Sequence, residues 1–534
     1  MALNNTYSFD EFLNWRNNVN FYADDPFLQK VAMHFAGNDF PQLDAEARRL
    51  SKLASFSWRD ISDDIAWPHN RIFMQHYDGH NHRIDRIVRP KALEEMEKQV
   101  FSQGLFSSKT SPWERLIKMI LIYENGEAGI DCPLVCTEGL VALLEKYHDH
   151  PELEKILQHC KEGMDGNFAI GAQYLSEIHG GSDVAANDLE AVEEGDHWRL
   201  YGKKFFCSAT HADYVVITAR PKGSEHVGLF VMPSWLDKQN EKRNNYTIDR
   251  LKWKLGTAEL PTAEITFNGT IAYKTGAVQR GVANVVGIVL THSRLTVGLS
   301  AAAAMIRAAR EATAYANFRT AFGFPINQFP LLKRQLNEIN LYAKRTLAGA
   351  FKIYEMFQSL PGGLKGGLTT DEDIATQQKR FRVRILIMLQ KIIASWDATD
   401  VLRKAISVFG GHGVMEDFSS LPRLFRDMMI NELWEGPRNV LLTQIYRDMQ
   451  RAASWYPLNQ FINDLLYNAD SCVIDEVTAA FDRCLSSNFI YPGQDNAELC
   501  LLWEEAAHKL LHEFQNCALH EVEAAREDAA LSGK

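Results

Sequence analysis

A stretch of short apolar segments, residues 166–280, lies between two regions with helical patterns, and this order limits the possible folds more than any other feature. The segments are rich in β-branched and aromatic residues and are separated by Gly, Asn and Pro, as strands joined by turns are. They predict an antiparallel sheet or barrel, unlike a Rossmann arrangement, in which strands and helices alternate. The segments are HWRLYGKKFFCS (197–208), DYVVITARP (213–221), VGLFVMP (227–233) and AEITFNGTIAY (263–273).

Helical patterns dominate the rest of the chain. Residues 111–129 have helical apolar spacing and begin with Ser-Pro, a common helix start, while residues 292–319 are Ala-rich and amphipathic. The sequence therefore predicts an α+β fold in four parts. These are a mostly helical N-terminal domain (1–165), a central antiparallel β domain (166–280), a C-terminal helical bundle (281–450) and a helical C-terminal extension (451–534).

The composition fits a chain of several packed units. With 534 residues, 46% of them hydrophobic, three or four such units are expected. No run of about 18 apolar residues is present, so no membrane span is expected, and the N-terminus lacks the pattern of a signal peptide. The eight cysteines form no CxxC pair, which predicts reduced thiols in a cytoplasmic protein.

Charge and histidine content argue against two kinds of partner. The net charge is −11, and residues 451–534 carry fourteen acidic and five basic side chains, which disfavours nucleic-acid binding. Three histidines in HYDGHNHRID (76–85) raise the question of a metal, but no carboxylate–histidine helix pattern accompanies them. A polar turn is the better interpretation, and no metal site is expected.

The segment GAQYLSEIHGGSDVAAND (171–188) has the composition of a ligand-binding turn. Its paired glycines allow a phosphate or a flat ring to approach the main chain closely, and Ser176 and Ser182 offer hydroxyl groups. Taken alone, however, a Gly-Gly-Ser-Asp sequence predicts only a turn.

In ELWEGPRNV (432–440), Glu435 lies between an indole and a glycine. One interpretation is a helix N-terminal carboxylate favoured by the helix dipole. The other is a carboxylate in an apolar pocket, where Trp434 raises its pKa and suits it to accept a proton.

Five segments together resemble the acyl-CoA dehydrogenase family, and they occur in the family's order. In the family they are the flavin-contacting Ser-Glu and Gly-rich turn, the Gly-x-Lys-x-Trp-Ile-Thr strand, the Arg-x-x-Phe-Gly element, the Gly-Gly-x-Gly loop and an Arg-Asp segment that ends in aromatic-Glu-Gly. The Trp-Glu-Gly form, the long N-terminal region and the helical extension are most similar to the AidB-type branch. The segments are YLSEIHGGSDV (174–184), GKKFFCSATHADYVVITAR (202–220), FRTAFGFPINQFP (318–330), FGGHGV (409–414) and LPRLFRDMMINELWEG (421–436).

The resemblance implies an FAD cofactor. Ser176 and Ser208 take the positions whose hydroxyls bond the flavin ring, and Phe206 takes the place of the aromatic residue packed on it. Arg319 and Phe322 match residues that a neighbouring subunit offers to the adenylate end, which implies a homotetramer or homodimer. The positions implied for FAD are Gln173, Leu175, Ser176, Gly181, Ser182, Phe206, Ser208, Arg319, Phe322, Gly410, Gly411 and Asn439.

The resemblance also implies the reaction. In the family a carboxylate removes the α-proton of an acyl-CoA while the β-hydride goes to flavin N5, and Glu435 aligns with that base. The developing charge on the thioester oxygen is stabilised by a ribityl hydroxyl and by the main-chain N–H of the base. Some members carry the base just before an Arg that aligns with Arg294, but Ser293 stands there and cannot serve. The substrate-binding positions implied are Ser182, Arg294, Trp434 and Gly436.

Three residues depart from the family pattern. Pro437 replaces a usual Thr or Ser, while Pro330 and Ser407 replace usual glutamines. Because proline removes an N–H, these changes affect the expected contacts to the adenylate and pyrophosphate. Arg438 is hypothesised to supply replacement charge to a phosphate.

Three functions follow from the resemblance. The first is an acyl-CoA dehydrogenase that passes electrons to an electron-transfer flavoprotein. The second is an AidB-like flavoprotein of the alkylation or stress response that associates with DNA, which would need a basic surface that the acidic extension does not offer. The third is a flavin oxidase or monooxygenase, whose members commonly lack the catalytic Glu, so Glu435 argues against it.

Overall fold

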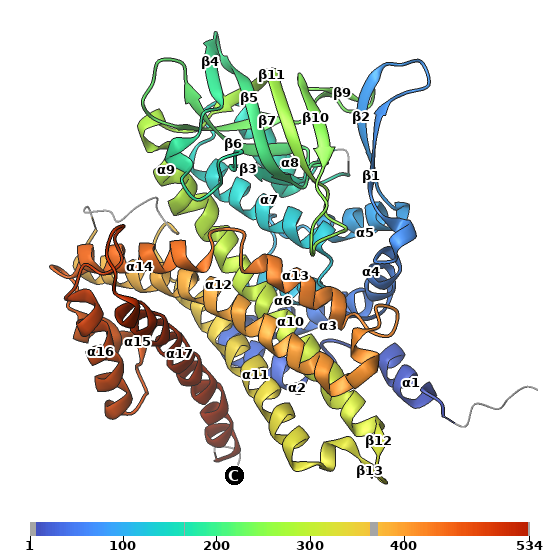
Figure 1. Ribbon diagram of the computed structural model, residues 1–534, viewed down its shortest axis with the longest axis vertical. Helices are drawn as coiled ribbons and strands as arrows, with labels where there is room; N and C mark the ends of the chain where they lie inside the picture. Colours follow the sequence, from blue (N-terminus) through green and yellow to red (C-terminus); the bar gives the residue numbers. More distant parts are fainter. Residues whose placement is uncertain (1–6, 165, 364–371, 532–534) are drawn as a thin grey trace, which may run out of the picture.

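The computed structural model describes residues 7–164, 166–363 and 372–531. Its N-terminal part is helical except for one hairpin, β1–β2, which extends beside strand β10 of the β domain (Figure 1). The elements of this part are α1 (Asp10–Asn18), α2 (Pro26–Ala36), α3 (Phe40–Lys52), α4 (Arg59–Ile65), β1 (Phe73–Tyr77), β2 (Arg83–Val88), α5 (Lys91–Phe101), α6 (Pro112–Tyr123), α7 (Ala128–Lys146) and α8 (Pro151–Glu162).

The helix expected near residue 111 begins where the sequence indicates. The Ser111 hydroxyl accepts a 3.2 Å hydrogen bond from the Glu114 N–H, and Pro112 occupies the first helical position. The helical pattern over 111–129 is nevertheless interrupted, because α6 ends at Tyr123 and Gly126 adopts a φ of +57° before α7 begins. Glycine adopts this left-handed conformation without the strain that a side chain would add.

The central β domain contains nine strands among the described residues. They are β3 (Gly171–Tyr174), β4 (Glu190–Glu194), β5 (His197–Ser208), β6 (Tyr214–Pro221), β7 (Gly228–Pro233), β8 (Trp235–Asp237), β9 (Lys242–Arg243), β10 (Tyr246–Leu251) and β11 (Thr262–Lys274). The main sheet has the order β10-β11-β5-β4-β6-β3, and β7 pairs with both β6 and β11, so that five strands close into a ring. Most pairs are antiparallel as expected, but β6 pairs in parallel with β3 and with β4, so the sheet is mixed.

Long helices form the lower half of the molecule and the C-terminal extension packs on one side of them (Figure 1). The bundle contains α9 (Gly281–Asn284), α10 (Leu290–Phe318), β12 (Thr320–Ala321), β13 (Phe324–Pro325), α11 (Pro330–Gln358), α12 (Ile374–Phe409), α13 (Leu421–Asn431) and α14 (Arg438–Ala452). The extension contains α15 (Leu458–Leu465), α16 (Ser471–Leu485) and α17 (Ala497–Leu531). The acyl-CoA dehydrogenase-like arrangement expected from the sequence is therefore present.

One stretch, Val278–Phe318, is apolar and long enough to cross a membrane by length and composition. Its most apolar window is 89% buried inside the molecule, where α10 packs against α11 and α12. Burial against neighbouring helices accounts for its composition, as in the core helix of a globular protein.

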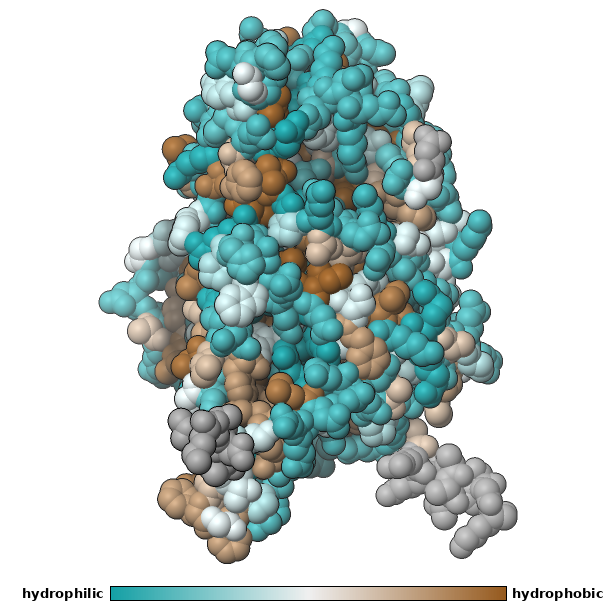
Figure 2. Space-filling model, turned by 90° about the vertical axis from the view of Figure 1, so that its right-hand side faces the viewer, coloured by the Kyte–Doolittle hydropathy of each residue, from teal (hydrophilic) through white to brown (hydrophobic). Residues whose placement is uncertain are grey.

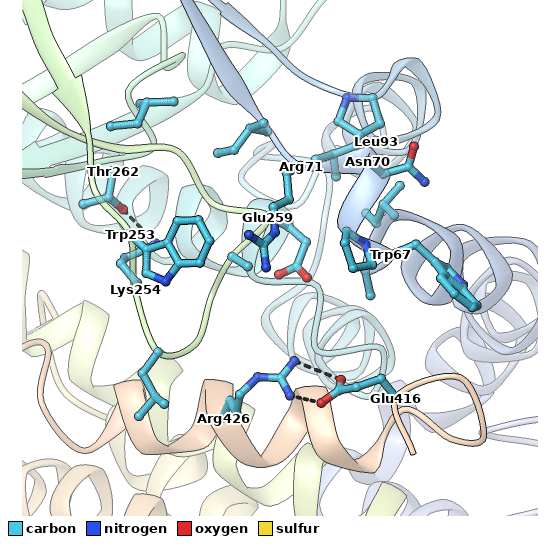
Figure 3. Close-up of a pocket in the computed structure, with 18 of the residues that line it drawn as sticks. Trp67, Asn70, Arg71, Leu93, Trp253, Lys254, Glu259, Thr262, Glu416 and Arg426 are labelled. Carbon is cyan, nitrogen blue, oxygen red and sulfur yellow. Dashed lines mark hydrogen bonds and ion pairs between the residues drawn. The ribbon is translucent and has the colours of Figure 1, made fainter. Parts of the chain in front are cut away.

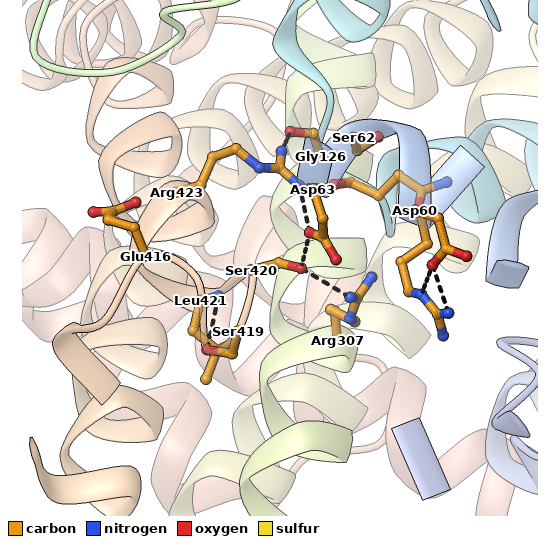
Figure 4. A network of polar contacts seen from close by, with 12 residues as sticks. Asp60, Ser62, Asp63, Gly126, Arg307, Glu416, Ser419, Ser420, Leu421 and Arg423 are labelled. Carbon is orange, nitrogen blue, oxygen red and sulfur yellow. Dashed lines mark hydrogen bonds and ion pairs between the residues drawn. The ribbon is translucent and has the colours of Figure 1, made fainter. Parts of the chain in front are cut away.

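A buried polar network fixes the start of α13 (Figure 4). The Ser420 hydroxyl donates a 2.6 Å hydrogen bond to Asp63 and accepts one of 3.2 Å from Arg307, which joins α13 to α4 and α10. Arg423 donates to the carbonyl oxygens of Gly126 and, at 2.9 Å, Asn125. Because α13 leads directly into the turn that carries Glu435, the network also determines where that turn lies.

Candidate active site

Glu435 lies in a left-handed turn between α13 and α14. Its φ is +59° and that of Gly436 is +102°, and a Cβ added at Gly436 would lie 3.1 Å from Leu441. A residue other than glycine with positive φ is uncommon and is retained where surrounding structure imposes it. Since α14 begins only at Arg438, Glu435 is not in the first turn of a helix, and the dipole interpretation does not describe its position.

Two buried cations hold this turn through its carbonyl groups. Arg294 of α10 donates from Nε to the carbonyl oxygen of Glu435 at 2.9 Å. Lys391 of α12 donates from Nζ to the carbonyl oxygens of Glu432 at 3.1 Å and Gly436 at 2.8 Å. The turn is therefore fixed from both sides.

The same groups determine the electrostatics of Glu435. Burial raises the pKa of Glu435, while Arg294 and Lys391 oppose that rise. Burial lowers the pKa of Lys391 to about 7 and that of Arg294 to about 10. Trp434 packs against both the helical core and the β-domain core, which supplies the expected apolar wall. The carboxyl thus has the raised pKa that a general base working near neutral pH requires.

Polar atoms without partners lie near the turn. Gln173 of β3 donates from Nε2 to the Ser293 hydroxyl at 3.0 Å, which joins the β domain to α10. The Gln173 Oε1 and the Trp434 Nε1 are buried and have no hydrogen-bond partner among the described residues. Buried polar atoms are almost always satisfied in proteins, so these two atoms indicate a place for a bound ligand.

The expected flavin contacts lie together at the ends of two strands. Ser176 follows β3 and Ser208 ends β5, and the Ser208 hydroxyl lies 3.1 Å from that of Thr262. Phe206 is 50% exposed and Lys252 Nζ lies 4.5 Å from its ring centroid, so only the exposed part of the ring can pack against a flat group. A Cβ at Gly181 would lie 2.2 Å from the Ser176 hydroxyl, so only glycine lets the Gly-rich turn fold back over Ser176.

Three other residues that were expected to bind the cofactor are partly buried or exposed. Leu175 is partly buried and its carbonyl oxygen accepts from Lys204 at 3.1 Å. Ser182 is exposed in the Gly-rich turn, and Asn439 is exposed in the first turn of α14. Their main chains and side chains are therefore accessible to a ligand, although no direct contact joins them to Glu435 among the described residues.

A second group of expected residues lies at the opposite end of the molecule. Arg319 and Phe322 lie at the β12–β13 hairpin, far below the β domain (Figure 1). Gly410 and Gly411 follow α12 near the same end, where Tyr315 stacks on Phe409 with ring centroids 4.1 Å apart. One chain does not bring this group to the Ser176 region, and the Phe322 side chain is 93% exposed.

The hypothesis for Arg438 requires correction. Its guanidinium donates to Glu504 Oε2 and contacts His508 Nε2, each at 3.1 Å, so it is engaged by α17 of the extension. The charge proposed for a phosphate is already paired with a carboxylate. Pro330 and Pro437 both stand at helix starts, where the missing N–H leaves no hydrogen bond within the helix unmade.

Sequence reasoning missed Lys391. The signal was present, because Lys391 is the single charged residue in the mostly apolar run ILIMLQKIIASW (385–396). A buried lysine needs compensating partners, but its partners are main-chain carbonyls 41 and 45 residues away, which no side-chain pattern reveals.

The segment HYDGHNHRID (76–85) forms the turn between extended pieces that the sequence predicts, because it joins β1 to β2. His76 and His82 pair with Asp85 at 2.9 Å and Asp78 at 3.1 Å. A cluster of metal-ligand type that the sequence did not suggest joins α12 to α17, with ligand atoms within 4.8 Å of one another. Arg345 lies 3.8 Å from the carboxylate of this cluster, and Arg438 lies 3.1 Å from Nε2 of one of its histidines, so the cluster already has two positively charged neighbours. The cluster consists of Asp397, His508 and His512.

A cavity of about 620 Å³ lies between α4, the β10–β11 loop and α13 (Figure 3). Trp67, Arg71, Trp253 and Glu259 are among the residues that line it. None of the expected site residues lines it, but Thr262 does, and its hydroxyl meets that of Ser208. Figure 2 shows this side of the molecule, where apolar side chains gather at mid-height below a mostly polar upper part.

Comparison with known proteins agrees with the fold. The acyl-CoA dehydrogenase middle domain matches residues 172–270 and the acyl-CoA dehydrogenase C-terminal domain matches residues 279–450, together about half of the chain. The chain therefore belongs to the acyl-CoA dehydrogenase family. Membership confirms an oxidoreductase acting on CH–CH groups, in a family whose cofactor is FAD.

Particular relatives resemble the chain over most of its length. Acyl-CoA dehydrogenase family member 11 of Caenorhabditis elegans is 26% identical over 80% of this chain and 70% of its own. AidB of Escherichia coli (strain K12) is 25% identical over 83% of this chain and 80% of its own. Both relatives therefore align with regions beyond the two matched domains.

Solved structures share the fold. The apo form of Bd2924 has a TM-score of 0.82 at 24% identity, covering 95% of this chain and 98% of its own. ACDH-11 of Caenorhabditis elegans, in complex with C11-CoA, has a TM-score of 0.78 at 21% identity, covering 94% of this chain and 91% of its own. The helical extension is thus part of a shared architecture.

Proposed function

We propose that this chain is an FAD-dependent acyl-CoA dehydrogenase in which Glu435 removes the α-proton of an acyl-CoA and an enoyl-CoA is formed. The observation that carries the proposal is the Glu435 carboxyl itself. It lies beside an apolar wall with a raised pKa, on a turn held by Arg294 and Lys391. A surface carboxylate would need none of these features.

The residues between the β domain and the helical bundle fit FAD. Ser176 and Ser208 would donate hydroxyl hydrogen bonds to the flavin edge, and the exposed part of the Phe206 ring would pack on the flavin. The buried, unpartnered Gln173 Oε1 supports a ligand with a hydrogen-bond donor here. Bound FAD supplies the acceptor for the β-hydride of the substrate.

Glu435 has two separable roles in this proposal. Its carboxylate takes the α-proton, and its raised pKa increases the basicity of that carboxylate. Its main-chain N–H has no acceptor among the described residues, so it is free to donate to the thioester oxygen, where negative charge develops. Arg294 and Lys391 bond only carbonyl oxygens of this turn and leave that N–H available.

The cellular location, electron acceptor and oligomeric state that we propose are those implied by the resemblance to the family. We propose an AidB-like dehydrogenase that acts in the cytoplasm, passes electrons to an electron-transfer flavoprotein and assembles as a homotetramer or homodimer. The exposed β12–β13 hairpin, with Arg319 and Phe322, supports contact with the FAD of a neighbouring subunit. The acyl-CoA bound by the ACDH-11 relative supports a thioester substrate.

An anaerobic titration tests the proposal. The purified flavoprotein is mixed with short, long, branched and cyclic acyl-CoAs while its flavin absorbance is followed, with Glu435→Gln alongside. Bleaching of the wild type by one thioester, with the variant still oxidised, supports the dehydrogenase and identifies its substrate class. A bound flavin that no acyl-CoA reduces rejects it and favours the stress-response flavoprotein, for which DNA binding is the next measurement.

A further inference from the structure

The amine of Lys391 lies at the meeting point of α12 and the Glu435 turn. The residue is 0% exposed. Its Nζ donates to the carbonyl of Glu432 before Glu435 and to that of Gly436 after it, at 3.1 and 2.8 Å. These contacts span the two left-handed residues, so one side chain fixes both ends of the strained part of the turn.

An ammonium group has three N–H bonds, and these two carbonyls take two of them. The charged groups that act on Lys391 are Glu435, Glu432 and Arg294. Arg294 in turn lies in the field of Arg384 and Asp448, on α12 and α14. The positive charge of Arg294 lowers the pKa of Lys391. The Glu435 carboxylate acts in the opposite direction and raises the pKa of both cations.

We infer that Lys391 is a positioning residue for the proposed reaction: its buried ammonium fixes the turn that carries Glu435 and keeps the Glu435 carboxyl in the ionised form that a base requires. The inference rests on the proposed role of Glu435 as base. A carboxylate in an apolar pocket reverts to the neutral acid unless a charge or a hydrogen-bond donor stabilises it. The direction of the Glu435 and Lys391 pKa shifts, each opposed by the other residue, agrees with such a pair.

The test measures the protonation of Glu435 directly and needs no substrate. The carboxyl of Glu435 is titrated by infrared difference spectroscopy of the holoenzyme, with Glu435→Gln used to assign its band. Lys391→Met removes the charge at similar volume, and Lys391→Gln removes it while keeping a donor. Lys391→Arg keeps the charge, and Lys118→Met is a matched control, because Lys118 is buried and bonds the carbonyl of Gln103 far from the turn.

We expect the titration midpoint of Glu435 to rise by about one pH unit or more in the Met and Gln variants and to stay near the wild-type value in the Arg and control variants. At a pH below both midpoints, flavin reduction should fall roughly tenfold for each pH unit by which the midpoint rises, and it should recover at higher pH. A midpoint in the Met and Gln variants equal to that of the wild type overturns the inference. Since the infrared midpoint is independent of acyl-CoA, this result is distinct from failure of the proposed dehydrogenase activity.

Discussion

Arg294 Nε lies 2.9 Å from the carbonyl oxygen of Glu435 and donates to it, although 141 positions separate the two residues in sequence. Arg294 is only 4% exposed, so the contact is made in the interior, where a single hydrogen bond orients more strongly than at the surface. The direction in which the Glu435 carboxyl points therefore depends on α10 as well as on its own turn.

Replacing Arg294 by Gln should slow flavin reduction by about 10- to 100-fold with little loss of bound FAD. The reason is geometric, because a shift of about 1 Å in a catalytic group is enough to cause a loss of that size. Stopped-flow reduction and the flavin-to-protein absorbance ratio measure the two effects. Arg380→Gln is the control, since Arg380 is also buried and bonds the carbonyl of Pro361 away from the turn. Equal rates for wild type and Arg294→Gln would contradict the prediction.

Glu435→Gln should raise the thermal stability of the apoprotein at pH 8 but not at pH 4. The folded pKa of Glu435 is raised above its ordinary 4.5, so the folded state binds a proton more tightly than the unfolded chain. The stability of the wild type therefore falls as pH rises from the unfolded pKa to the folded pKa, and the Gln variant escapes that fall. Calorimetric melting at several pH values checks this. A Tm difference that does not change with pH would show that burial does not perturb the carboxyl.

Ser208→Ala and Ser176→Ala should each weaken FAD binding by about 1 kcal/mol, roughly fivefold in Kd, by removing one hydroxyl hydrogen bond. Reconstitution of apoprotein followed by fluorescence gives the affinities. Ser224→Ala, in the exposed β6–β7 turn, is the matched control. If all three variants bind FAD equally, the flavin edge does not lie at these strand ends.

Phe322→Ala should lower both FAD retention and the oligomeric mass. The side chain is 93% exposed in the single chain, and an exposed aromatic of this size commonly marks an interface. Light scattering and flavin content during dilution follow the two properties. Leu501, 57% exposed on α17, gives Leu501→Ala as a control for loss of exposed apolar surface. A fully assembled, flavin-saturated Phe322→Ala protein would place the neighbour's contacts elsewhere.

Arg423→Met should destabilise the fold by about 3 to 5 kcal/mol, as breaking a buried charge arrangement does. Arg423 is 3% exposed and opposes the raised pKa values of Glu127 and Asp427, the latter at about 7. Without the guanidinium these carboxyls stay protonated to higher pH. Chemical denaturation at pH 7 measures the change, and Arg426→Met, which removes the more exposed pair with Glu416, should cost far less. Similar losses in both variants would contradict a special role for Arg423.

The sequence predicted individual elements better than their partners. The segment HWRLYGKKFFCS was expected to form a strand and is β5 (His197–Ser208), because its aromatic residues favour the extended backbone of a strand. The parallel pairing of β3 with β6 was missed, since strand periodicity carries no information about direction. Glu435 was found through a short sequence motif. Lys391 was missed because it bonds main-chain carbonyl groups, which every residue carries whatever its side chain.

The contact of Arg438 with α17 has a consequence for how the chain folds during translation. Arg438 follows Glu435 by three residues, and Glu504 and His508 hold it. During translation the β domain and most of the bundle leave the ribosome before those two residues exist. The start of α14, and with it one support of the catalytic turn, can reach its final arrangement only after residue 508 has emerged. A nascent chain stalled short of that point would fold most of its structure and still lack a finished active site.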